Sequence, residues 1–107
     1  MKTYNKLVRD KIPEIIEADG EMPKVRILGE AEYKVALLEK LVEESREAMA
    51  AKGDPKELSK EIGDVLEVID ATIEAFGLDR SRIEESKQKR KESRGGFEKR
   101  LFLEFTK

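Results

Sequence analysis

Acidic residues occur at regular spacings on two amphipathic segments, as Glu43-Glu44-x-x-Glu47 and Glu61-x-x-Asp64. A helix turns by about 100° per residue, so acids three positions apart lie on neighbouring parts of one helical face. Four carboxylates in a partly desolvated groove repel one another unless some hold protons or a divalent cation neutralises them. Oxygen ligands suit Mg²⁺ or Mn²⁺, which commonly bridge protein carboxylates and substrate phosphates. The spacing therefore raises the hypothesis of a metal site.

Each of the two segments carries a stripe of apolar residues along one side. The positions of the acids relative to these stripes distinguish them from ordinary surface charge. Glu44 sits at the border of one stripe, beside Leu41 and Ala48, while Glu61 falls inside the other. Glu47 and Asp64 lie just outside the stripes, and Glu43 points to the other side of its helix and is a lesser candidate. The competing interpretation is a solvated acidic face on a non-catalytic helical oligomer.

Two long helices must position these acids. Apolar residues recur at steps of three and four over residues 29–52 and again over residues 55–76. Gly53 ends the first helix, and Asp54 followed by Pro55 supplies a cap for the second. Such a short connection predicts an antiparallel pair.

The remaining elements are shorter or more polar. We expect a short helix over Pro13–Ala18 and a third long helix that begins at Asp79 or Ser81 and ends at Gly95–Gly96. Alternating apolar residues over 101–105 predict a terminal strand, paired with residues 25–28. The predicted fold class is mainly α, an antiparallel helical bundle with a small C-terminal β appendage.

Basic residues form a second set of candidates, for binding phosphate. They are Lys87, Arg90, Lys91 and Arg94 on the third long helix, followed by a Gly95–Gly96 turn, and Lys6, Arg9 and Lys11 near the N-terminus. Lysine and arginine bind phosphate oxygens, and a Gly–Gly turn permits close approach of an anion. The alternative is a solubilising face that also favours the helix dipole.

Composition excludes several kinds of chemistry. The chain of 107 residues contains no cysteine and no histidine, which rules out thiolate, disulfide and histidine-based sites. The net charge of −2 and a pI near 5.4 argue against nucleic-acid and membrane-surface binding. Because the first ten residues lack an apolar signal region and no apolar run suits a membrane span, we expect a cytoplasmic protein.

The acidic pattern with its thirteen-residue spacer resembles the metal-binding signature of the all-α, MazG-like nucleoside triphosphate pyrophosphohydrolases. The segments Tyr4–Pro13 (YNKLVRDKIP) and Arg94–Phe97 (RGGF) resemble a compact prokaryotic subgroup that is phosphoribosyl-ATP pyrophosphohydrolase-like. The resemblance covers nearly the whole chain. It implies one helical domain over residues 1–107, assembled as a dimer or tetramer.

The resemblance also implies an activity, the Mg²⁺-dependent hydrolysis of a nucleoside triphosphate to a monophosphate and pyrophosphate, with Mn²⁺ as a substitute. Carried over residue by residue, the metal ligands and catalytic acids are Glu44, Glu47, Glu61 and Asp64. A water then attacks the α-phosphorus, one glutamate takes its proton, and Lys and Arg stabilise the remaining charge. The resemblance implies a standard or non-standard nucleotide as the substrate, or alternatively phosphoribosyl-ATP in histidine biosynthesis.

Overall fold

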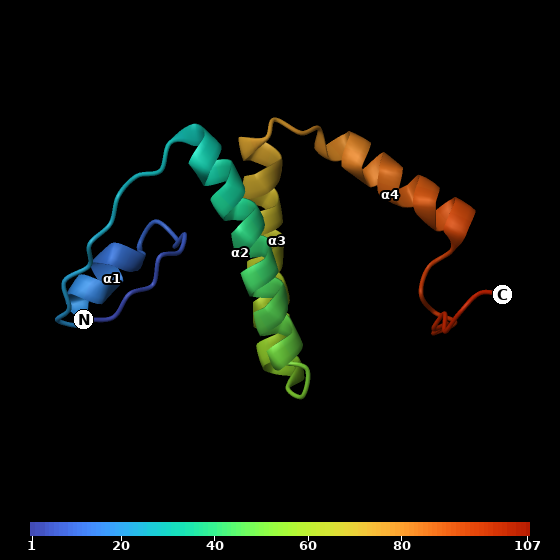
Figure 1. Ribbon diagram of the computed structural model, residues 1–107, viewed down its shortest axis with the longest axis horizontal. Coiled ribbons are helices and arrows are strands. Elements are labelled where there is room, and N and C mark those ends of the chain that lie inside the picture. Colours follow the sequence, from blue (N-terminus) through green and yellow to red (C-terminus); the bar gives the residue numbers. More distant parts are fainter. The chain divides into compact units, whose positions relative to one another are not determined.

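A computed structural model describes all residues, 1–107, and contains helices without any strand. The helices are α1 (Ile12–Ala18), α2 (Glu30–Ala50), α3 (Pro55–Ala75) and α4 (Arg80–Arg94) (Figure 1). The mainly α prediction is confirmed. The chain divides into two compact units, Met1–Phe76 and Gly77–Lys107, which are described separately below. A single domain over the whole chain stays a prediction.

Side-chain caps define where two of the helices begin. Asp54 accepts hydrogen bonds from the backbone N–H groups of Lys56 at 3.0 Å and Glu57 at 3.4 Å, which fixes the first turn of α3. Asp79, rather than Ser81, caps α4, and it accepts from both the N–H and the hydroxyl of Ser81 at 2.9 and 2.6 Å. These caps explain why local sequence predicts both starting points.

The two long helices of the first unit pack side by side as an antiparallel hairpin (Figure 1). Their core is thin, because its buried apolar side chains are only Leu37 and Ala48 from α2 and Val68 from α3, and none of them is completely buried. Glu44 is also buried, one turn before Ala48. A carboxylate thus occupies a core position of the hairpin.

One side of the hairpin carries exposed apolar side chains, which we call the apolar face. On each helix, these residues lie about 120° around the helix axis from the residues that pack against the other helix. The rotation has the same sense on both helices when each is viewed from its N-terminus. Because the helices are antiparallel, the two apolar stripes therefore lie on the same side of the hairpin. The apolar face consists of Val35, Leu38, Val42 and Met49 on α2, and Ile62 and Leu66 on α3.

No helix combines the length and apolar run that a bilayer crossing requires.

The predicted C-terminal β appendage is wrong. Residues 101–107 and residues 21–29 form no strand or bridge. The two segments fall in different compact units, and an isolated strand has no partner for its backbone groups. Phe102 also breaks the alternation, and Leu101, Phe102 and Leu103 are all strongly exposed. Alternation of apolar residues indicates a strand only where one face is covered.

Candidate metal centre

Three carboxylates from the two long helices meet at the hairpin seam, and we call them the acidic trio. Glu44 comes from α2, and Glu61 and Asp64 come from α3. One oxygen from each lies within 4.8 Å of the others. Glu61 and Asp64 are three residues apart, so both face α2 on the same side of α3. The antiparallel packing then brings Glu44 opposite them.

The carboxylate oxygens of the acidic trio are only partly satisfied. The Glu44 side chain is 9% exposed, and its Oε1 lies 3.2 Å from the Lys40 ammonium. Its Oε2, like the Oε2 of Glu61, is buried without a hydrogen-bond partner. Buried oxygens without partners are uncommon and costly. Two such oxygens beside a third carboxylate fit a small divalent cation with oxygen ligands.

A lysine on α2 that sequence reasoning missed neutralises part of this charge. The side chain of Lys40 is 15% exposed, and its ammonium contacts Glu43 at 3.4 Å and Glu44 at 3.2 Å. The available signal was its position three and four residues before these acids, a spacing that favours helical ion pairs. Lys40 thus pairs with Oε1 of Glu44, while Oε2 keeps no hydrogen-bond partner.

Two of the predicted phosphate-binding residues contact acids of the hairpin. Lys6 lies 3.4 Å from Glu43, and the Arg9 guanidinium donates to Asp64 Oδ1 at 2.8 Å. Lys11 forms no ion pair. The N-terminal segment is therefore attached beside the acidic trio. Binding of phosphate by Lys6 and Arg9 stays a prediction.

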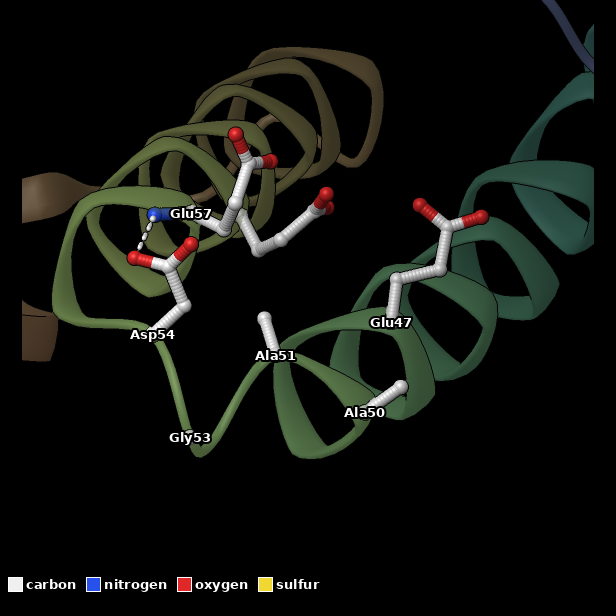
Figure 2. Close-up of a pocket in the computed structure, with 7 residues that line it drawn as sticks. Glu47, Ala50, Ala51, Gly53, Asp54 and Glu57 are labelled. Carbon is white, nitrogen blue, oxygen red and sulfur yellow. Dashed lines mark hydrogen bonds between the residues drawn. The ribbon is translucent and has the colours of Figure 1, made fainter.

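An open hollow of about 460 Å³ lies near the connection between α2 and α3 and continues to Glu61. Figure 2 shows Glu47 on the α2 side, with Asp54 and Glu57 at the start of α3. Glu47 is exposed and lies outside the group whose oxygens approach within 4.8 Å. Its role as a metal ligand stays a prediction. It borders the same hollow as Glu61 and is open to water.

The other predicted phosphate-binding residues belong to the second unit. Lys87, Arg90, Lys91 and Arg94 all lie on α4 and are exposed. Lys87 pairs with Glu84 at 3.2 Å, as charges on a solvated helix commonly do. Gly95 ends the helix with a φ of +85°, a conformation that glycine adopts readily. The phosphate-binding role of these four residues stays a prediction.

Comparison with known proteins leaves the family open. The chain is 53% identical over 45 residues to an uncharacterized protein of Mycolicibacterium smegmatis. The match covers 42% of this chain and 46% of the relative, so the chain aligns with about half the length of the curated relative it matches. No family model matches the chain, and no solved structure matches it.

Proposed function

We propose that this protein is a Mg²⁺-dependent nucleotide pyrophosphohydrolase of the MazG-like type, which converts a standard or non-standard nucleoside triphosphate to the monophosphate and pyrophosphate. The observation that carries the proposal is the buried, unpartnered Oε2 of Glu44 beside Glu61 and Asp64. A solvated acidic face would turn its oxygens to water, whereas Glu44 holds one in the hairpin seam. The resemblance of the acidic motif supplies the reaction.

The negative charge around the acidic trio supports a bound cation. Lys6, Arg9 and Lys40 balance most, but not all, of the negative charge of the nearby carboxylates. The unbalanced acid is Glu61, whose buried Oε2 has no partner. The negative groups concerned are Glu43, Glu44, Glu61 and Asp64.

The position of each residue suggests its role in the proposed reaction. Glu44, Glu61 and Asp64 would hold the ion. When bound there, Mg²⁺ would supply positive charge that offsets the negative charge developing on the leaving pyrophosphate. Glu47 and Glu61 border the same hollow, so either can accept a proton from a water that attacks the α-phosphorus. Lysine and arginine side chains would stabilise the phosphate charge.

The test is pyrophosphate release from a panel of standard and modified nucleoside triphosphates plus phosphoribosyl-ATP, with Mg²⁺ or with EDTA. We compare the wild type with Glu61→Gln and with a matched control, Glu67→Gln, which alters an exposed acid further along α3. We expect release that requires Mg²⁺, survives in the control and is lost in Glu61→Gln. Preference for phosphoribosyl-ATP would select the histidine-biosynthesis alternative. No release from a folded wild type would favour the non-catalytic oligomer.

We also propose that the apolar face is covered by a second copy of the chain. The hairpin buries few apolar side chains of its own, while Val42 is 49% and Leu66 is 55% exposed on that face. The charged side of the hairpin, with Glu43 and Asp64, lies opposite and stays accessible. Sedimentation should show a dimer or tetramer that Val42→Glu dissociates, while Lys52→Glu, at the end of the hairpin, leaves it intact. A monomeric wild type would contradict this proposal.

A further inference from the structure

The first eleven residues, which we call the N-terminal arm, have no helix or strand, and ion pairs attach them to the charged side of the hairpin. Lys6 contacts Glu43 of α2, and Arg9 contacts Asp64 of α3. Leu7 and Val8, between them, are half-buried. The arm therefore spans both helices beside the acidic trio.

Asp64 has two roles in this arrangement. It accepts a hydrogen bond from Arg9 at 2.8 Å, and it is also one of the three carboxylates whose oxygens lie within 4.8 Å of one another. An ion held by the acidic trio would bring a double positive charge close to the Arg9 guanidinium. Like charges at such short range repel. One carboxylate therefore cannot serve both partners equally well.

We propose that Arg9 is the resident counter-ion of Asp64 and competes with the divalent cation for that carboxylate. Metal binding then releases the guanidinium from Asp64 while leaving it next to the ion, where it can bind a phosphate oxygen of the substrate. The inference rests on the proposed metal site and adds a regulation of that site by the N-terminal arm.

Both side chains of the Arg9–Asp64 pair are exposed, so the exchange of Arg9 for the metal ion at Asp64 is reversible. The Arg9 side chain is 59% exposed and the Asp64 side chain is 42% exposed. Exposed ion pairs contribute little to stability, so removing the competitor should tighten metal binding by about two- to fivefold. A buried ion pair between the same two residues would instead keep the metal ion from binding.

The experiment is calorimetric titration of the metal-free protein with Mn²⁺ alone, for the wild type, Arg9→Gln and Arg26→Gln. Arg26 is a matched control, because it also pairs with an acid, donating to both oxygens of Glu32 at 3.0 and 2.5 Å. Glu32 and Glu44 lie on one helix about 18 Å apart along its axis. That distance exceeds the screening length of about 8 Å at physiological salt, so Arg26→Gln removes one charge without touching the site.

We expect Arg9→Gln to bind Mn²⁺ two- to fivefold more tightly than both the wild type and Arg26→Gln. Equal or weaker binding by Arg9→Gln would overturn the competition and leave the metal site standing. Absence of Mn²⁺ binding by the wild type would overturn both. A second readout is the NMR signal of the Arg9 side-chain N–H, which should shift on adding Mg²⁺ while that of Arg26 stays in place; an unchanged Arg9 signal would also count against the exchange.

Discussion

Replacing Glu44 by glutamine should stabilise the metal-free protein and destabilise it relative to wild type when Mg²⁺ is present. Like charges 4.8 Å apart repel by about 0.9 kcal/mol at the dielectric constant of water and by about 3.5 kcal/mol at an effective value of 20. Glu44→Gln relieves two such repulsions, with Glu61 and with Asp64. It costs one ion pair with Lys40 at 3.2 Å, worth about 1.3 kcal/mol at the dielectric constant of water and about 5.2 kcal/mol at an effective value of 20, and Lys40 keeps its contact with Glu43.

The net gain in the free energy of unfolding without metal is therefore about 0.4 kcal/mol at the dielectric constant of water and about 1.7 kcal/mol at an effective value of 20, and each kcal/mol raises Tm by about 4–8 °C for a domain of this size. Wild type in Mg²⁺ at one hundred times its Kd should gain about 2.7 kcal/mol, whereas the variant has lost a ligand and should gain much less. The order of the two melting temperatures should therefore reverse between EDTA and Mg²⁺.

The assay is thermal unfolding followed by circular dichroism at one fixed protein concentration, with Glu39→Gln as the control. Glu39 is exposed on the same helix and forms no ion pair, so its melting temperature should follow that of wild type in both conditions. A Glu44→Gln variant that is less stable than wild type in EDTA would refute the argument from repulsion. Equal stabilisation of both proteins by Mg²⁺ would refute the metal site.

Two further predictions concern the helix caps. Asp54→Ala removes the acceptor for the first N–H groups of α3 and should cost about 1 kcal/mol of stability, measured by chemical unfolding; an unchanged midpoint would contradict the cap. The hydroxyl and then the backbone N–H of Ser81 lower the pKa of Asp79 below its ordinary value, so its contribution to α4 is fully present above that ordinary value and is lost as the pH falls through the lowered pKa. NMR titration of Asp79 in wild type and in Ser81→Ala should show the pKa rising towards its ordinary value in the variant; an equal pKa in both would count against the hydrogen bond.

Prediction of the helices from sequence succeeded where the signals were local. Asp54 and Pro55 mark the start of α3, and Gly95 follows the end of α4. Each signal acts through hydrogen bonds or backbone angles within a few residues, so its effect is the same in any fold. The terminal strand failed because pairing requires a distant partner, and residues 101–107 have none.

The candidate site shows the same division. The sequence by itself determined that Glu61 and Asp64 share one face of α3, and that Glu44 borders the apolar stripe of α2, because both follow from helical period. Only the tertiary structure decided that their oxygens approach within 4.8 Å and that Arg9 contacts Asp64, 55 residues further along the chain. Contacts between segments depend on how side chains pack and which charges meet, and these are properties of the folded chain rather than of any local spacing.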